Sequence, residues 1–221
     1  MPRLIAMFGG TFDPVHNAHM RVALDVAEAG GLDEVRLIPC HFPPHRGQPA
    51  VASRQRLRML ELAAADEPCF VVDDRELRRE APSYTADTLL SLRADFPDSR
   101  LCLLLGTDSF RSLPRWHRWR ELAELAHIVV MQRPEPGPAM PPDLVTWLRG
   151  RERESWAALR ESANGCILFQ KVTQLAISAT DLRERLGGGG SGRYLMPEPV
   201  WSYIREEGLY GVASDGQAGR T

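Results

Sequence analysis

The chain has 221 residues, a length that suits one α/β domain or one domain with a small appendage. Its 27 Lys and Arg against 29 Asp and Glu leave a net charge of −2, which gives no electrostatic reason to expect nucleic acid or an anionic membrane as a partner. No apolar run reaches the roughly 18 residues of a transmembrane helix, and no secretory signal pattern precedes the first strand-like segment. Four scattered cysteines without a C-x-x-C pair are typical of reduced thiols, so we expect a cytoplasmic protein without a zinc site.

Short apolar runs alternate with helical patterns along the chain. Buried strands are predicted at residues 3–8, 34–40, 69–74, 101–106 and 127–133, and a further strand within 167–177. Helices are predicted at residues 19–31, 53–66 (with Ser53 as N-cap), 83–96, 119–126, 178–186 and 197–209. Because the strands are apolar throughout and alternate with helices, the pattern indicates an α/β, Rossmann-like, doubly wound and mostly parallel sheet of five to six strands, with helices on both faces.

The same pattern predicts the domain organisation. Residues 1–211 are expected to form a single domain, whose last part, about 178–211, is a helical C-terminal segment. The Pro-rich stretch 134–143 is interpreted as a connector within that domain, and the glycine run 187–192 as a flexible loop. Residues 212–221 are expected to be a flexible tail.

A glycine-rich turn, GGTFDP, follows the first predicted strand. Ligands of parallel α/β sheets bind beyond the carboxyl ends of the strands, at the point where the strand order reverses. Gly9 and Gly10 would let the backbone approach a ligand there, and Thr11 would add a hydroxyl. The Asp-Pro pair that follows predicts a turn, and the next helix would then present its free N–H groups to an anion.

Two histidines lie three residues apart at the predicted start of that helix. His16 and His19 would share one helix face, from which imidazoles can donate hydrogen bonds to phosphate oxygens. A metal site and a pair of structural histidines are the alternatives. The metal alternative lacks the glutamate of H-E-x-x-H and a third nearby ligand, so phosphate binding is the favoured interpretation.

A second phosphate-binding pattern lies in the segment ISATDLRERL, residues 177–186. Ser178 and Asp181 form the S-x-x-[DE] pattern of a capped helix start, and Arg183 in the early turns could bind a phosphate with two hydrogen bonds. Taken alone, this segment would more simply be a capped surface helix with a solvated arginine. Together with residues 9–19, it predicts two helix N-termini that converge on one polyphosphate.

At these residues the chain resembles the nucleotidyltransferases of the HxGH type. GGTFDPVHNAH is similar to their (G/S)xFDPxHxGH signature, with Ala18 in the place of the usual glycine, and the later motif ISxTxxR is matched at Ile177, Ser178, Thr180 and Arg183. The resemblance implies a protein that binds ATP, with Mg²⁺ on the β- and γ-phosphates and no metal ligands from the chain. It also implies that His19, His16 and Arg183 are catalytic, and that Gly9, Gly10, Thr11, Gly106 and Asp108 contribute to ATP binding with both motifs.

Further segments resemble one branch of that superfamily, the bacterial nicotinate-nucleotide adenylyltransferases. The similar segments are PPHR (43–46), APSYTADTL (81–89), GTDSFRSLPRWHRW (106–119) and LMPEPVWSYIREEGLY (195–210). The resemblance implies transfer of AMP from ATP to nicotinate mononucleotide, which gives deamido-NAD (nicotinate adenine dinucleotide) and pyrophosphate in NAD biosynthesis. Other cosubstrates, nicotinamide mononucleotide or phosphopantetheine, and a non-catalytic nucleotide-binding regulator are the alternatives, and an oligomer remains possible.

The substrate-binding residues expected for nicotinate mononucleotide follow from the same segments. Trp116 could stack on the flat ring, and backbone N–H groups at Tyr84 and Thr85 could bind its carboxylate. Arg46 and Arg133 are expected to contact phosphates. Alternatives stay open: Tyr84 could simply pack in the core, and Asp108 could be an N-cap rather than a ligand of ribose hydroxyls.

Overall fold

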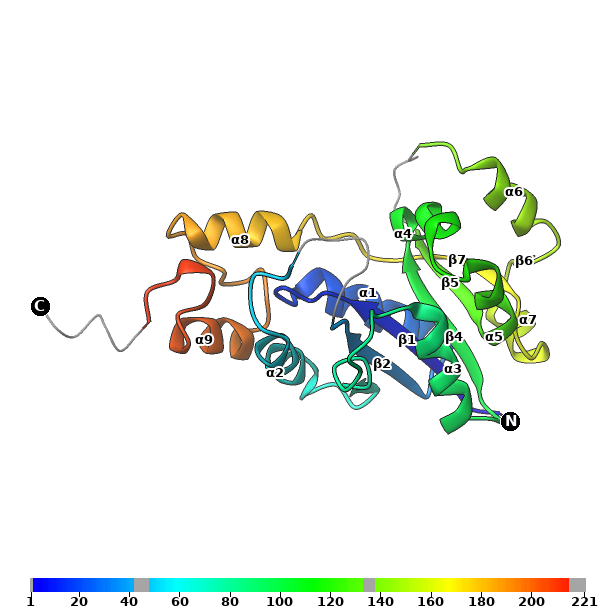
Figure 1. The fold of residues 1–221 in the computed structure, drawn as a ribbon, viewed down its shortest axis with the longest axis horizontal. Coiled ribbons are helices and arrows are strands. Elements are labelled where there is room, and N and C mark those ends of the chain that lie inside the picture. Colours follow the sequence, from blue (N-terminus) through cyan, green and yellow to red (C-terminus); the bar gives the residue numbers. More distant parts are fainter. Residues whose placement is uncertain (1, 42–47, 133–137, 215–221) are drawn as a thin grey trace, which may run out of the picture.

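The computed structural model describes residues 2–41, 48–132 and 138–214. Seven strands form one sheet in the order β3-β2-β1-β4-β5-β7-β6, and every neighbouring pair is parallel (Figure 1). The strands are β1 (Leu4–Gly10), β2 (Glu34–Pro39), β3 (Phe70–Val72), β4 (Arg100–Gly106), β5 (His127–Gln132), β6 (Glu152–Arg153) and β7 (Ile167–Lys171). The doubly wound, Rossmann-like α/β fold is thus confirmed.

The predicted count of five to six strands is wrong, because the described residues form seven. The additional strand β6 has only two residues, Glu152 and Arg153, and pairs with the start of β7. Two charged residues carry no apolar signal from which a strand could be predicted.

The strand order reverses between β1 and β4, at the centre of the sheet. Met7 pairs with Leu103, and Gly10 and Gly106 each lie three residues further along and end their strands. The glycine-rich turn after β1 therefore lies beside the carboxyl end of β4, where ligands of this fold class bind.

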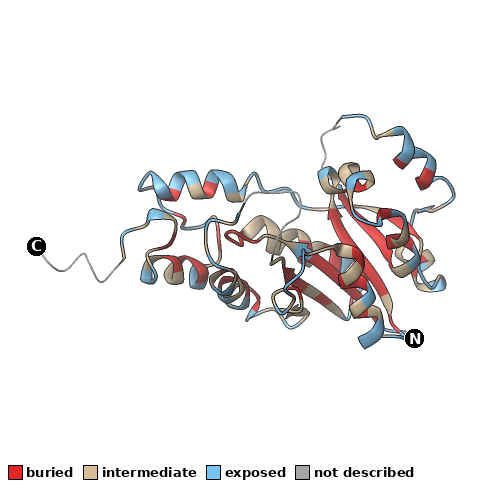
Figure 2. Ribbon diagram, viewed as in Figure 1, coloured by how far each residue is buried: buried red, intermediate tan, exposed pale blue. Residues whose placement is uncertain are grey.

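Helices cover both faces of the sheet, as the sequence predicts. The helices are α1 (Asn17–Gly30), α2 (Ser53–Ala64), α3 (Thr85–Asp95), α4 (Thr107–Ser112), α5 (Leu122–Leu125), α6 (Pro142–Leu148), α7 (Trp156–Glu161), α8 (Ala179–Gly187) and α9 (Glu198–Glu206), with short 3-10 turns η1 (Leu113–Arg115), η2 (Trp119–Glu121) and η3 (Leu209–Gly211). One core cluster joins the sheet to α1, α2, α7, α8 and α9, and the other joins it to α3, α4, α5 and α6. Successive residues of β1 alternate between the clusters, since side chains of a strand point to opposite faces, and β1, β4 and β5 are almost entirely buried (Figure 2).

The C-terminal segment packs on one side of the sheet through α2. Helix α9 contacts α2, and α8 contacts η3 (Figure 1). Arg183 of α8 and Tyr210 of η3 both reach Asp13 in the turn that follows β1. No helix in the described ranges is both long enough and apolar enough to span a bilayer.

The glycine run after α8 is a packed helix end rather than a flexible loop. The amides of Gly188, Gly189 and Gly190 all donate to carbonyls in the last turns of α8, at 2.8–3.0 Å. A Cβ atom at Gly192 would lie 2.8 Å from Met196 and 3.0 Å from the Trp201 ring. The glycines thus permit tight packing, which the sequence pattern alone did not distinguish from flexibility.

Candidate active site

One large cleft opens at the carboxyl ends of β1 and β4, with a volume of about 1160 Å³. Every described residue predicted for the site lines it: Gly9, Gly10, Thr11, His16, His19, Tyr84, Thr85, Gly106, Asp108, Trp116, Ile177, Ser178 and Arg183. The two remaining predicted residues, Arg46 and Arg133, lie outside the described residues. The cleft therefore brings together segments that are about 170 residues apart in the chain.

The two histidines lie at the very start of α1, with their rings stacked. His16 is the N-cap residue rather than a helical residue, and its backbone N–H donates to Nδ1 of His19 at 3.3 Å. The ring centroids are 3.7 Å apart, and the His19 ring also contacts the edge of Phe12. Because Nδ1 of His19 accepts a hydrogen bond, the ring proton of a neutral His19 is on Nε2.

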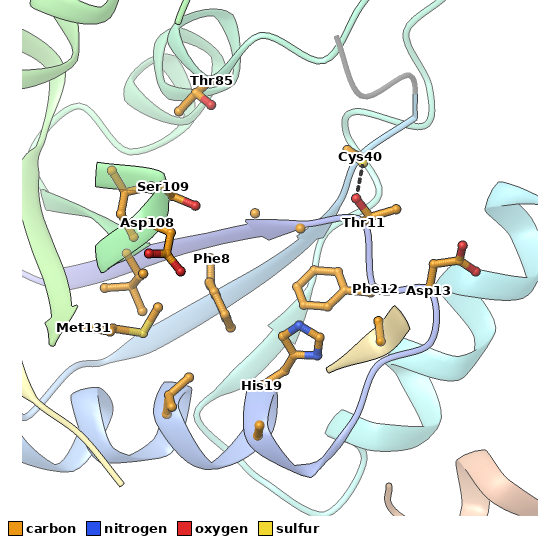
Figure 3. A pocket seen from close by; sticks show the side chains of 18 of the residues that line it. Phe8, Thr11, Phe12, Asp13, His19, Cys40, Thr85, Asp108, Ser109 and Met131 are labelled. Carbon is orange, nitrogen blue, oxygen red and sulfur yellow. Dashed lines mark hydrogen bonds between the residues drawn. The ribbon is translucent and has the colours of Figure 1, made fainter. Parts of the chain in front are cut away.

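Burial determines the charge of His16. The residue is only 4% exposed, and burial lowers the pKa of its imidazole to about 4. His16 is therefore neutral at physiological pH and can act on an anion only as a hydrogen-bond donor. Figure 3 shows His19 above the first turn of α1, facing the cleft beside Phe12, with Asp108 across from it and Thr85 further away.

Asp13 joins four segments around the turn after β1. Its backbone carbonyl accepts from Nη1 of Arg183 at 2.7 Å, and this contact ties α8 to the first motif. The carboxylate accepts from the Tyr210 hydroxyl and from the Ala50 amide, each at 2.7 Å. Burial, and then the neighbouring Asp13, raises the pKa of Tyr210, so its hydroxyl stays a donor.

The start of α8 has the capped geometry that the sequence predicts. The Ser178 hydroxyl accepts from the Asp181 amide at 3.1 Å, and Ser178 is the N-cap. Arg183 lies one turn further along the helix and points back to the Asp13 carbonyl. The two predicted helix N-termini thus border the same cleft, each at one side of the turn after β1.

The opposite part of the cleft is aromatic. Tyr84 is the N-cap residue of α3, so the N–H of Thr85 lies at the helix start, but the Tyr84 N–H donates to the Pro82 carbonyl at 3.0 Å and is not available to a carboxylate as the sequence suggested. The Tyr84 ring lies 4.4 Å from the ring of His117. Trp116 is half-buried and donates from Nε1 to the Ser112 hydroxyl at 3.2 Å, which fixes its ring at the cleft. A flat aromatic ligand with a carboxylate is chemically complementary to this part of the cleft.

Glycines leave space where the two central strands end. A Cβ atom on Gly106 would have no neighbour within 4 Å, and one on Gly9 would only reach ordinary contact distance. At Gly10, by contrast, a Cβ would lie 3.0 Å from the Phe12 ring. Asp108 lies in the first turn of α4, whose N-cap is Gly106, so the alternative that Asp108 is the N-cap is wrong.

Two buried charged residues near the cleft were missed from the sequence. Arg56 of α2 is fully buried and donates to backbone carbonyls in the turn after β1 and in the loop after β2. Glu76 is 5% exposed, lines the cleft, and accepts from the Thr88 hydroxyl at 2.7 Å, while burial raises the pKa of its carboxyl. Arg56 precedes the buried Met59 and Leu60 by three and four residues, and this spacing could have placed it on the buried face.

Comparison with known proteins agrees with this geometry. Residues 7–185 match the model of the Cytidylyltransferase-like family, a range that contains both phosphate motifs. A protein of Aeromonas salmonicida (strain A449) is 48% identical over 206 residues, which is 93% of this chain and 96% of that protein. A protein of Halorhodospira halophila (strain DSM 244 / SL1) is 50% identical over 209 residues, which is 95% of this chain and 96% of that protein. Both relatives carry the name "Probable nicotinate-nucleotide adenylyltransferase".

The chain belongs to the nicotinate-nucleotide adenylyltransferases of the Cytidylyltransferase-like family. Solved structures of the Plasmodium falciparum nicotinic acid mononucleotide adenylyltransferase, complexed with APC or with NaAD, have the same fold. Each superimposes with a TM-score of 0.71 and 16% sequence identity, over 95% of this chain and 98% of the Plasmodium chain. The family resemblance that the motifs carry is therefore confirmed.

Proposed function

We propose that this nicotinate-nucleotide adenylyltransferase transfers the adenylyl group of ATP to nicotinate mononucleotide. The phosphate of the mononucleotide attacks the α-phosphorus of ATP, the bond to the β-phosphate oxygen breaks, and nicotinate adenine dinucleotide and pyrophosphate leave. The attacking oxygen is already anionic, so no general base is required. The work of the site is to position two polyanions and to stabilise charge at the α-phosphorus.

One observation carries the proposal: the capped starts of α1 and α8 border one cleft, tied together by the 2.7 Å contact from Arg183 to Asp13. Each helix start offers free N–H groups to an anion. In the proposal, Nε2 of His19 donates to the α-phosphate, and His16, Thr11 and Arg183 hold the other phosphates. Mg²⁺ enters with ATP, on its β- and γ-oxygens, as part of the substrate.

The aromatic part of the cleft supports nicotinate mononucleotide as the cosubstrate. Trp116 and Thr85 both line this part of the cleft, and in the proposal Trp116 stacks on the ring while the start of α3 at Thr85 binds its carboxylate. Asp108 lies between the two ends of the cleft and is assigned to ribose hydroxyls, while Arg46 and Arg133 remain predicted phosphate contacts. The same proposal includes small-molecule substrates and no nucleic acid. It also includes a reducing, cytoplasmic location, which the four free thiols support.

The test is a coupled assay of pyrophosphate release with ATP and Mg²⁺. We expect a higher kcat/KM with nicotinate mononucleotide than with nicotinamide mononucleotide or phosphopantetheine, because only the first has a carboxylate for the start of α3. A preference for the amide would contradict the carboxylate pocket. Tight ATP binding without pyrophosphate release from any of the three would instead favour a non-catalytic regulator.

A further inference from the structure

Arg56 lies directly behind the wall of the cleft without lining it. Its guanidinium donates from Nη1 to the Thr11 carbonyl at 2.6 Å, and from Nη2 to the Cys40 carbonyl at 2.8 Å and to the Ser53 hydroxyl at 3.0 Å. Thr11 and Cys40 line the cleft, one after β1 and one after β2. The side chain thus braces the two loops that flank the proposed phosphate site.

A side chain of this kind is costly to bury. Arg56 is 0% exposed, no carboxylate among the described residues forms an ion pair with it, and its Nε has no hydrogen-bond partner there. Buried charges without an ion pair are unfavourable, and an apolar residue of similar size would serve packing better. Arg56 therefore fits a role in the site better than a role in the core.

The contact with Thr11 determines how one peptide group is turned. In a trans peptide the N–H points opposite to the C=O, so a Thr11 carbonyl that accepts from Arg56 turns the Phe12 amide away from Arg56, and Phe12 itself lines the cleft. Phe12 holds a left-handed backbone with φ of 49°, which non-glycine residues adopt only with support. No described residue accepts a hydrogen bond from this amide.

The charges around the turn are also unbalanced. Arg56 and Arg183 contribute two positive charges near the turn, and Asp13, whose carboxylate accepts at both oxygens, contributes one negative charge. These three residues therefore leave one net positive charge at the turn, and two of them, Arg56 and Asp13, are buried. Positive charge is effective on an anion at such a site because screening is weak there.

We propose that Arg56 is a positioning residue for phosphate binding, which holds the Phe12 amide toward the cleft and supplies buried positive charge beneath the polyphosphate. The inference rests on the proposed function only for the identity of the polyphosphate as ATP. Its own content is that an anion binds the turn after β1 because Arg56 orders and charges that turn.

The test compares Arg56→Lys and Arg56→Met with the same substitutions at Arg93. Arg93 is a matched control because it is half-buried and also donates to backbone carbonyls, of Ser99 at 2.6 Å and Leu125 at 2.9 Å, far from the cleft lining. Inhibition constants of inorganic pyrophosphate and of adenosine, and the KM of ATP, are measured well below each variant's Tm. Pyrophosphate probes the anion site, and adenosine probes the rest of the nucleotide site.

We expect Arg56→Lys to weaken pyrophosphate binding and to raise the ATP KM by about tenfold, with adenosine binding changed less than about twofold, and Arg56→Met to have a larger effect. The Arg93 variants should lower Tm and leave all three constants unchanged. Wild-type pyrophosphate binding in Arg56→Lys, or equal weakening of pyrophosphate and adenosine, would overturn the inference.

A measurement on the unsubstituted protein decides the matter if the Arg56 variants do not fold. With ¹⁵N-phenylalanine labelling, and Phe12→Leu to assign the signal, the Phe12 amide should shift on addition of pyrophosphate and not of adenosine. An unmoved Phe12 signal at saturating pyrophosphate would overturn the inference. A wild type that binds pyrophosphate in this way but releases none from ATP would refute the proposed function and leave the inference standing.

Discussion

At the scale of single residues, His19 has two separable tasks. Its Nδ1 accepts from the His16 backbone and so caps α1, and its Nε2 is the proposed donor to the α-phosphate. Asparagine places an acceptor near the Nδ1 position but has no group at the Nε2 position, so His19→Asn keeps the cap and loses the donor. We expect both His19→Asn and His19→Ala to lower kcat by roughly 100- to 1,000-fold, the usual effect of a lost transition-state donor.

Stability distinguishes the two variants. His19→Ala loses the capping acceptor as well, and its free energy of unfolding should fall by about 1 kcal/mol, more than that of His19→Asn. Urea unfolding at pH 7 measures this difference beside the kinetics. A His19→Asn enzyme with wild-type kcat would rule out the donor role.

Ala18 is the residue at which the chain departs from the HxGH signature. It is the second residue of α1 and lines the cleft. A larger side chain there should reduce the space for the nucleotide, so Ala18→Val is expected to raise the KM of ATP by about tenfold or more. Ala18→Gly should leave that KM close to the wild-type value and cost up to about 1 kcal/mol of stability through helix propensity.

The control for Ala18 is Ala29→Val, on the exposed side of the same helix. It introduces the same β-branched residue away from the cleft. Equal increases of KM in the two valine variants would show that the effect comes from α1 as a whole and not from the cleft.

At the scale of elements, the C-terminal turn η3 is attached to the first motif by a partly buried hydrogen bond from Tyr210 to Asp13. Tyr210→Phe removes the donor to the Asp13 carboxylate without changing the ring. Because hydrogen bonds to charged groups contribute about 1.5–3 kcal/mol, we expect a loss of this size in the free energy of unfolding and a higher KM of ATP. Tyr203→Phe on α9 is the control, because the Tyr203 hydroxyl donates to no other described residue, and we expect it to change both quantities less.

The elements also show what could be predicted from the sequence. The apolar runs of β1, β4 and β5 and the S-x-x-D start of α8 are local signals, and the structure has the elements close to where they were predicted. The N-cap of α2 is Ala52 rather than Ser53, whose hydroxyl instead accepts from Arg56. Arg56 is itself held by the Thr11 and Cys40 carbonyls, which are distant in the chain, and a local sequence pattern does not contain those contacts.

The site follows the same division between local and long-range information. Its glycines, histidines and Arg183 were found because each belongs to a short motif, and family resemblance supplied their order. Arg56 and Glu76 were missed because their importance comes from burial, which is set by segments distant in the chain. Spacing within α2 gave a signal for Arg56, but residues 54–79 contain six arginines, and without the fold nothing ranked Arg56 above the others.

At the scale of the whole molecule, two buried histidines couple folding to pH. His127 of β5 is fully buried and lies at the end of the sheet opposite the cleft, where its Nδ1 accepts from the Cys166 amide at 3.2 Å. Burial lowers the pKa of His127 from 6.5 to about 4, and the nearby Arg100 and Arg93 act in the same direction, against carbonyls of Ser162 and Leu159. The pKa of His16 is lowered to about 4 by burial alone.

The sign of the effect follows from proton uptake. Below pH 6.5 the unfolded chain binds protons at these histidines, and the native state binds them only near pH 4, so stability is complete above pH 6.5 and is lost as the pH falls toward 4. The difference between a pKa of 6.5 in the unfolded chain and a pKa of about 4 in the folded protein corresponds to about 3 kcal/mol of folding free energy for each histidine. Between pH 7 and pH 5 we expect each to contribute a loss of about 2 kcal/mol.

His127→Gln tests this at the scale of the fold without touching the cleft. Urea titrations at pH 7 and pH 5 give the fall in the free energy of unfolding between the two pH values. That fall should be about 2 kcal/mol smaller in His127→Gln than in the wild type, whatever the stability of the variant at pH 7. His117→Gln, at an exposed position, should keep the wild-type difference. If His127→Gln also kept the wild-type difference, protonation of His127 would not govern acid stability. The same titrations on His16→Gln would then test the other buried histidine, which stacks on His19.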